Sequence, residues 1–426
     1  LGAAAGTSPK VEFSVLCQQG HQHFVDRQFE RAVDFLSRAV EAAREGQQSG
    51  HHVDATALLQ CGHELVTALR KLGRMQEAVQ ATKQCLALQQ EVMGKGDATT
   101  LLLQSELATL LEKMQRFEEA LLVHREVLAA RRKTLPKGHP DTLWTLSKKA
   151  YCLSALGRTA DGVRIRKQHL DLCRLVDKQD PATFASLYSL ALAYSQDGQV
   201  VEGLQVARKC LRKREQHLGL EHVDTLDTRH LVSTLWSRLG HMDQALEEER
   251  RCWETRSKVL GPTHRSTLNS MYAMGALLWE TGQHSEAVKV KRLCLESRLH
   301  CLGSAHLDTQ QSMSNLAKCL EQGGGQAELE EALDMFSECL DCRMEAQGPQ
   351  HPATLRSMFH VAMCLHKLGR LEEAEAVFTE CHQQMESTNH PWKDLHLEEK
   401  GEERGTGQQQ QEGKEKGETH PQSPAV

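Results

Sequence analysis

The residues with the clearest potential for chemistry lie in the stretch VLGPTHRSTL, residues 259–268. A glycine, a histidine and a threonine at this spacing could belong to a phosphate-binding loop, a metal site or a catalytic group. A second candidate is Cys339-x-x-Cys342, the only CxxC pair in the sequence, whose spacing suits zinc binding or thiol–disulfide exchange. Whether these residues react depends on the elements that carry them.

The stretch VLGPTHRSTL is one of seven related copies along the chain. The clear copies are TLPKGHPDTL at 134–143, HLGLEHVDTL at 217–226, CLGSAHLDTQ at 301–310 and AQGPQHPATL at 346–355, and the weaker ones are VMGKGDATTL at 92–101 and LVDKQDPATF at 175–184. A threonine column runs through all seven: Thr100, Thr142, Thr183, Thr225, Thr267, Thr309 and Thr354. Its members are 41 or 42 residues apart, except for a last spacing of 45. A fixed period of this length is typical of repeat architectures.

A second periodic signal alternates with the first. It consists of short turn segments such as GHMDQAL and GQHSEAV, each with one small residue: Ala32, Ala78, Ala120, Gly162, Gly203, Ala245, Ala287, Ala332 and Ala374. Nine turns indicate nine helix–turn–helix units over residues 11–385. The spacing of 45 indicates an insertion at Gly323-Gly324-Gly325.

The apolar pattern within a unit is helical. Apolar residues follow the threonines at i, i+3, i+4 and i+7, as in Met313, Leu316, Ala317 and Leu320. Each hairpin has an apolar face that it cannot cover alone, so neighbouring units must stack into one core. The sequence therefore predicts an all-α fold, an α-solenoid of about nine stacked units, with disordered segments at 1–10 and at 386–426, the latter rich in Gln, Glu, Gly and Lys.

Composition narrows the classes of partner. The 51 basic and 57 acidic residues nearly balance, so no basic excess favours nucleic acid or an anionic membrane. No apolar run approaches the roughly 18 residues that span a bilayer. Aromatic residues make up only 4% of the chain, which favours helices over sheets. We expect neither a nucleic-acid nor a membrane partner.

The pattern resembles tetratricopeptide repeats, in the long variety of about 42 residues found in kinesin light chains and nephrocystin-like proteins. The resemblance rests on the turns, on the linker CLESRLHCLGSAHLDT at 294–309, and on a small residue within the first helices: Ala108, Ala150, Ala191, Gly275, Ala317 and Ala362. It implies a right-handed superhelix and a non-catalytic scaffold or adaptor. The finer form of this expectation is a cargo adaptor like the kinesin light chains. Kinesin light chains also carry a heptad coiled coil before the repeats; the sequence shows none, so the resemblance does not extend to kinesin heavy chain as a partner.

The repeat geometry argues against chemistry at His264. Equivalent residues of stacked helices lie at least about 8–10 Å apart, whereas zinc needs its ligands within about 2.0–2.3 Å. Aspartate replaces histidine in two copies, and proline follows in three, which is typical of helix N-caps. The predicted N-caps are Asp97, His139, Asp180, His222, His264, His306 and His351. No strand or GxxxxGK[ST] pattern supports a phosphate loop. We expect no metal, no cofactor and no catalytic group.

The cysteines follow the same register. Six share a column on the second helices and three share one on the first, so these nine are predicted to be small buried packing residues: Cys85, Cys210, Cys252, Cys294, Cys339, Cys381, Cys152, Cys319 and Cys364. Reduced thiols favour a cytoplasmic protein. An arginine column lies four residues beyond the first cysteine column: Arg131, Arg214, Arg256, Arg298 and Arg343. We interpret these arginines as packing on the neighbouring helix with the guanidinium bound to a carboxylate or carbonyl; an acidic-ligand surface is the alternative.

By resemblance, the first helix of each pair lines a concave groove that binds extended peptides. The candidate partner-binding residues are Trp144, Lys148, Tyr151, Tyr188, His230, Tyr272, Trp279, Asn315, Phe359 and His360. Only Asn315 remains of the Asn-Asn pairs typical of kinesin light chains, and the other positions are more aromatic. Such rings suit hot-spot contacts, or they fill gaps between helices.

Two further hypotheses concern mechanics and context. Gly162 and Gly203 replace alanine near the start of consecutive second helices, and Lys149 occupies an apolar position. Each glycine costs about 0.5–1 kcal/mol relative to alanine, so the units spanning 142–217 are predicted to be the least stable and to act as a hinge. The chain lacks an initial Met, and an alternative function is that of a regulatory or oligomerising repeat region within a larger enzyme or nucleotide-binding protein.

Overall fold

The structure is a computed structural model that describes residues 9–51 and 53–387. Eighteen α-helices and no strands occur in these residues. The first eleven are α1 (Pro9–Val25), α2 (Phe29–Gln48), α3 (Ala55–Lys71), α4 (Met75–Met93), α5 (Ala98–Lys113), α6 (Phe117–Thr134), α7 (Pro140–Ala155), α8 (Thr159–Val176), α9 (Pro181–Gln196), α10 (Val200–His217) and α11 (Val223–Arg238). The remaining seven are α12 (Met242–Val259), α13 (Arg265–Glu280), α14 (His284–Leu302), α15 (Leu307–Gly323), α16 (Gln326–Gln347), α17 (Pro352–Lys367) and α18 (Leu371–Ser387).

Along the sequence the described helices follow one another as nine successive helix–turn–helix pairs, which confirms the predicted all-α solenoid class. Helix α1 begins at Pro9 and α18 ends at Ser387, close to the predicted limits of the repeats. The sequence predicts disorder for residues 1–10 and 386–426; residues 9–10 and 386–387 instead belong to α1 and α18, and residues 1–8 and 388–426 lie outside the described residues.

The tight turns inside the hairpins contain one residue with a left-handed backbone conformation (positive φ). Gly157, between α7 and α8, has φ 71°, a conformation that costs glycine little and other residues more. Gln115 occupies the same place between α5 and α6 with φ 60°. The turn thus tolerates a side chain, although glycine is the usual choice.

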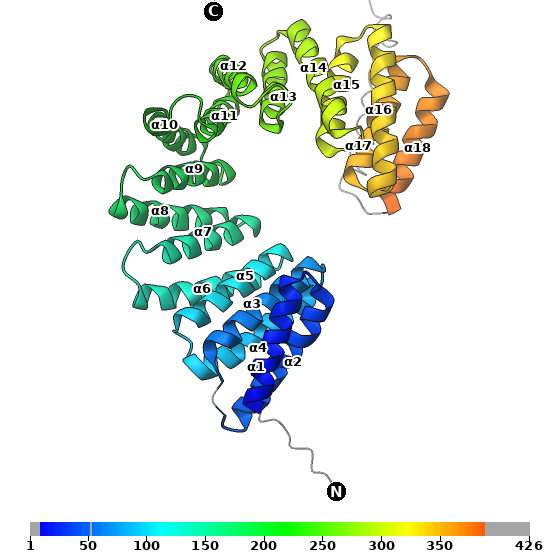
Figure 1. Cartoon of the computed structure of the whole chain (residues 1–426). Coiled ribbons are helices and arrows are strands. Elements are labelled where there is room, and N and C mark those ends of the chain that lie inside the picture. The colour runs from blue at the N-terminus through cyan, green and yellow to red at the C-terminus, as the bar shows by residue number, and fades with distance from the viewer. Residues whose placement is uncertain (1–8, 52, 388–426) are drawn as a thin grey trace, which may run out of the picture. The chain divides into compact units, whose positions relative to one another are not determined.

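The chain divides into two compact units, residues 1–240 and 241–426. In the first unit, consecutive helices from α1 to α11 lie side by side (Figure 1). One apolar cluster runs from Phe13 of α1 to Ile165 of α8, and smaller clusters continue through α8 to α11. The boundary between the units falls at Gly240, beyond the segment 142–217 that the glycines predicted as a hinge.

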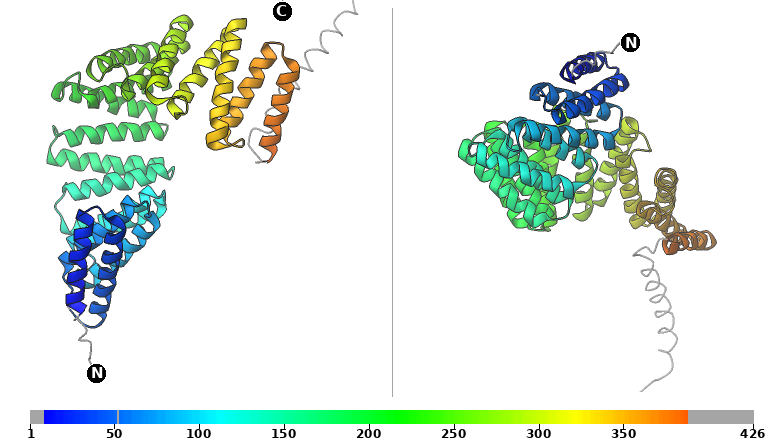
Figure 2. Two further views of the ribbon diagram at one scale, coloured as in Figure 1. Left: turned by 45° about the vertical axis from the view of Figure 1, so that its right-hand side comes forward. Right: turned by 90° about the horizontal axis from the view of Figure 1, so that it is seen from below.

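The second unit repeats this packing from α12 to α18, as a second view shows (Figure 2). Its core joins α14 to α18 around Leu316 and Phe336, which are 0% and 1% exposed. The insertion predicted at 323–325 is the turn between α15 and α16, where Gly324 is left-handed with φ 76°. Buried residues resume on both sides, at Leu320 and Leu329.

The nine cysteines of the two columns are all buried, as predicted. The thiols on the second helices also make hydrogen bonds. Cys210 Sγ donates to the carbonyl of Phe184 at 3.2 Å, and Cys294 Sγ to that of Leu268 at 3.6 Å. The thiol is small enough for the core and adds a weak hydrogen bond to the preceding first helix.

The arginine column forms a clamp between successive hairpins. Arg214 Nη1 on α10 donates to the carbonyl of Asp224 at 2.6 Å and to Thr228 Oγ1 at 2.8 Å, both on α11. Equivalent pairs of hydrogen bonds are made by Arg131, Arg256, Arg298 and Arg343. The interpretation of these arginines as packing residues bound to a carbonyl is confirmed.

None of the helices in the described part of the chain is long and apolar enough to cross a membrane.

Candidate functional site

The histidine of the stretch VLGPTHRSTL stands at a helix end. His264 is the N-cap of α13, and its Nδ1 accepts the backbone N–H of Ser266 at 3.2 Å. The same side-chain-to-backbone bond occurs at the six other positions of the column: Asp97, His139, Asp180, His222, His306 and His351. The ring nitrogen therefore satisfies an otherwise unpaired helix donor.

Three of the predicted binding residues come together on one face of α7. We call Trp144, Lys148 and Tyr151 the α7 patch. The Lys148 ammonium lies 5.6 Å from the centre of the Trp144 ring and 5.9 Å from that of Tyr151. The two rings are 40% and 49% exposed, although large aromatic side chains usually find cover. Phe117 of α6 packs edge-on against the Tyr151 ring, with ring centres 6.0 Å apart.

A buried carboxylate anchors the patch. Glu112, at the end of α5, accepts from Lys148 Nζ at 2.8 Å through Oε2 and from His124 Nε2 of α6 at 2.8 Å through Oε1. Cys152 Sγ of α7 lies 3.6 Å from the same Oε1. His124 and Cys152 are both fully buried. Three side chains from α6 and α7 therefore converge on one glutamate of α5.

The electrostatics of this cluster follow from its burial and its cations. Burial raises the pKa of Glu112, but hydrogen bonds from His124 and Lys148 outweigh it, so the pKa lies below its usual value. Burial, together with the negative charge of Glu112, raises the pKa of the Cys152 thiol to about 12. At neutral pH the cluster holds an ionised glutamate and a protonated thiol.

A related cluster occurs at the equivalent register in the second unit. Glu321 of α15 contacts His360 Nδ1 at 3.3 Å and Lys367 Nζ at 2.9 Å, both on α17. Cys364 occupies the place of Cys152, and burial followed by the charge of Glu321 raises its pKa to about 12. Phe336 stands where the first unit has His124, and its ring stacks on His360 with centres 4.7 Å apart.

The other predicted binding residues are engaged within the protein. Tyr188 lies under the Arg214 guanidinium at 5.2 Å. Tyr272 is covered in the same way by Arg298 at 5.0 Å, and its hydroxyl contacts Asn315. These two rings are half-buried between the clamp arginines and the first helices. Their position matches the alternative reading, in which rings fill gaps between helices.

Three further candidates are also partly covered. Trp279 packs on His284 with ring centres 4.3 Å apart, and Phe359 meets Phe378 at 6.0 Å. His230 is half-buried on α11. The α7 patch is therefore the place where predicted residues gather and stay open to solvent.

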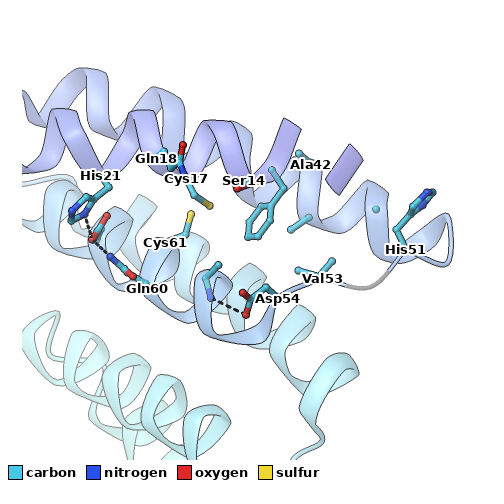
Figure 3. A pocket seen from close by; sticks show the side chains of 15 residues that line it. Ser14, Cys17, Gln18, His21, Ala42, His51, Val53, Asp54, Gln60 and Cys61 are labelled. Atoms are coloured by element: carbon cyan, nitrogen blue, oxygen red, sulfur yellow. Dashed lines mark hydrogen bonds and ion pairs between the residues drawn. The ribbon is translucent and has the colours of Figure 1, made fainter. Parts of the chain in front are cut away.

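A cavity of about 360 Å³ lies at the other end of the first unit, between α1, α2 and α3. Cys17 and Cys61 point toward each other across it (Figure 3). A hydrogen bond with Cys17, followed by burial, raises the pKa of the Cys61 thiol. His21 Nδ1 and Gln60 Nε2 both bind Glu64 Oε1, at 2.7 Å and 3.0 Å, so these polar groups of the wall are paired with one another.

Sequence reasoning missed the Glu112 cluster. The partners of Glu112 belong to different columns, lie 12 to 40 positions from it, and share no short motif with it. The signal available was the register: two units have glutamate twelve residues after the column threonine, and the next units have cysteine ten residues after theirs. Only the packing of α5, α6 and α7 brings these positions to one point.

Comparison with known proteins places the repeats in context. No curated protein sequence matches this one. Among solved structures, the apo quorum sensor NprR from B. thuringiensis aligns over 87% of this chain and 98% of its own, at 13% identity and TM-score 0.54. The signal transduction ATPase PH0952 from Pyrococcus horikoshii, which has a tetratricopeptide repeat sensor, aligns over 87% of this chain and 53% of its own, at 12% identity and TM-score 0.56. Both likenesses concern the fold.

A putative kinesin light chain from Podosopora anserina with nearly identical TPR-like repeats is 25% identical over 49% of this chain and 99% of its own, with TM-score 0.46. Family profiles described as tetratricopeptide repeat match residues 61–133, 183–224, 225–266 and 325–387, just over half of the chain. Together with the repeat period near 42 residues, these matches show that the chain belongs to the tetratricopeptide repeat family.

Proposed function

We propose that this chain is a non-catalytic scaffold or adaptor that binds a protein or peptide partner through the α7 patch. Repeats of this family generally bind proteins. The observation that carries the proposal is the exposure of Trp144 and Tyr151 on either side of Lys148. Large aromatic rings that are exposed to solvent, yet packed against a neighbouring side chain, are the usual anchors of protein interfaces.

The patch favours an apolar or aromatic anchor over a strongly acidic one. The charge of Lys148 is already balanced by Glu112 at 2.8 Å, so a ligand carboxylate would compete with a buried ion pair. The Trp144 and Tyr151 rings, in contrast, offer flat apolar surface whose burial needs no such exchange. We infer that the partner, which would be the cargo of an adaptor, inserts an apolar side chain against these rings.

A reducing compartment, the cytoplasm, fits the thiols. All fourteen cysteines are free, and eleven of them are buried. Proteins of oxidising compartments usually pair such residues in disulfides.

The test compares captured partners of the full chain and of two variants. Trp144→Ala with Tyr151→Ala should lose the partners that the wild type captures, and purified partners should bind the variant at least about tenfold more weakly, as expected for loss of hot-spot residues worth more than about 1.4 kcal/mol. Leu122→Ala, which removes a side chain of α6 that is 57% exposed, serves as the control. Equal affinity of wild type and double variant would refute the proposed site.

A further inference from the structure

We propose that Glu112, His124 and Cys152 form a zinc site that joins α5, α6 and α7. A carboxylate, an imidazole and a thiol are the three side-chain types that bind Zn²⁺ in proteins. Their ligand atoms all lie within 4.8 Å of one another, and this is the one such group in the described part of the chain. The site adjoins the α7 patch proposed above to bind a partner: Lys148 binds Glu112 at 2.8 Å, and the His124 ring meets the Trp144 ring edge-on at 6.0 Å.

The distances suit a tetrahedral ion after small shifts. Bonds of about 2.0–2.3 Å place neighbouring ligand atoms about 3.3–3.7 Å apart around zinc. Glu112 Oε1 and Cys152 Sγ are already 3.6 Å apart. His124 Nε2 is 2.8 Å from the same oxygen and needs to move outward by only about half an ångström to reach that range. Three protein ligands leave the fourth position for water.

The charges also fit a divalent ion. One carboxylate and one thiolate balance the two positive charges of zinc, and binding releases the thiol proton of Cys152 to solvent. Lys148 holds Oε2 of Glu112 and leaves Oε1 facing the other two ligands. When Nε2 binds metal the ring proton moves to Nδ1, which has no hydrogen-bond partner among the described residues, so the buried N–H formed there costs part of the binding free energy.

The second unit contains a natural comparison. At the Glu321 cluster the glutamate and Cys364 are kept, but Phe336 replaces the histidine of the second helix. The imidazole near Glu321 comes instead from His360 of α17, and Glu321, His360 and Cys364 do not bring their ligand atoms within 4.8 Å of one another, as Glu112, His124 and Cys152 do. This cluster is the internal control for metal binding.

The first test titrates the reduced, metal-free full chain with Co²⁺, a spectroscopic substitute for zinc. A Cys301→Ser background removes the exposed thiol beside His300. We expect one equivalent to bind with a thiolate-to-cobalt charge-transfer band that excess Zn²⁺ abolishes. His124→Phe, which copies Phe336, and Cys152→Ser should weaken binding by more than the roughly 10–100-fold typical for loss of an outer-shell partner. Glu321→Gln and Cys364→Ser should leave the titration unchanged.

A second measurement needs no substitution at the site. Cys152 and Cys364 are both fully buried at the same register, so each is alkylated only when the fold opens locally. Mass spectrometry should show that Zn²⁺ slows alkylation of Cys152 by at least about tenfold, the factor that a free ion at ten times its Kd produces. The rate at Cys364 should stay constant. A cobalt–thiolate band that survives Cys152→Ser, or equal alkylation of Cys152 with and without Zn²⁺, would overturn the proposal.

Discussion

Two joints of the first unit are built differently although they occupy equivalent places in the repeat. Between α10 and α11, Arg214 is 4% exposed and binds a carbonyl and a hydroxyl of the following helix. Between α8 and α9, the same position in the repeat is Cys173. There His169 Nδ1 contacts Ser186 Oγ at 2.8 Å, and Cys173 Sγ lies 3.7 Å from the same nitrogen.

The comparison predicts that the joint between α8 and α9 is the less stable of the two. A clamp arginine ties two hairpins by charge-assisted hydrogen bonds, which are stronger than the neutral contacts of His169. The long apolar cluster of the first unit also ends at α8, and separate clusters continue from there. The segment 142–217, predicted to be a hinge from its glycines, thus contains the one joint between α6 and α18 where the clamp position lacks arginine.

The largest effect is expected from removing a clamp. Arg214→Ala makes the joint between α10 and α11 resemble its neighbour, and it leaves the carbonyl of Asp224 and the hydroxyl of Thr228 without this donor. The free energy of unfolding should fall by about 2–4 kcal/mol. Urea denaturation measures this loss. The exposed Arg212→Ala should stay within about 0.5 kcal/mol, and an equal loss in both variants would mean that the clamp contributes nothing special.

In the wild type, the weak joint should open before the clamped one. Native-state hydrogen exchange should give amides of α8 and α9 an opening free energy about 1–3 kcal/mol below that of α10 and α11. This difference reflects the missing charge-assisted hydrogen bonds. Equal protection of both pairs would show that packing alone decides the order of opening.

Acid should increase the difference in opening free energy between the two joints. Burial, with the nearby charge of Arg166, lowers the pKa of His169 below its ordinary value of 6.5. Folding therefore favours the neutral ring, and its contribution to stability is present above pH 6.5 and is lost as the pH falls from 6.5 through the lower folded pKa. Exchange at α8 and α9 should accelerate below this pH more than at α10 and α11. His169→Gln should remove the extra acceleration.

The smallest expected effect is a difference in stability between the alanine variants of Gly162 and Gly203. A Cβ on Gly162 would lie 3.4 Å from Ser154 Oγ, an ordinary contact, so Gly162→Ala should stabilise the protein by about 0.5–1 kcal/mol. A Cβ on Gly203 would lie 3.3 Å from the carbonyl oxygen of Ala191 and from Tyr194 Cβ, so Gly203→Ala should gain less or lose stability. Thermal unfolding of both variants measures the difference, and equal gains would show that the backbone around Gly203 yields freely.

The sequence predicted the fold because each unit repeats the same physical solution. A histidine or aspartate at the start of a first helix, and a cysteine or alanine facing a neighbouring helix, could be assigned by register alone. The ring contacts could not be assigned in this way. Tyr188 and Tyr272 share a column with residues expected in a groove, but their fate depends on where Arg214 and Arg298 place their guanidinium groups. The binding role of the α7 patch stays a prediction.

The Glu112 cluster escaped prediction for a related reason. A repeat column records what is common to the units, whereas this cluster depends on which residues of three different columns occur together in neighbouring units. His124 is a histidine in one unit and Phe336 is its counterpart in another. Such coincidences become visible only when neighbouring helices are packed together.

The glycine-rich turn at residues 323–325 has a consequence for how a gene of this kind can change. Three additional codons lengthen one spacing from 42 to 45 residues, while the buried positions on both sides keep their register, as Leu320 and Leu329 show. Insertions and deletions at such turns are therefore filtered much less severely than those inside a helix, where one extra residue would rotate every following side chain by about 100°. The same turn offers a place to introduce an epitope or a fluorophore into the intact chain.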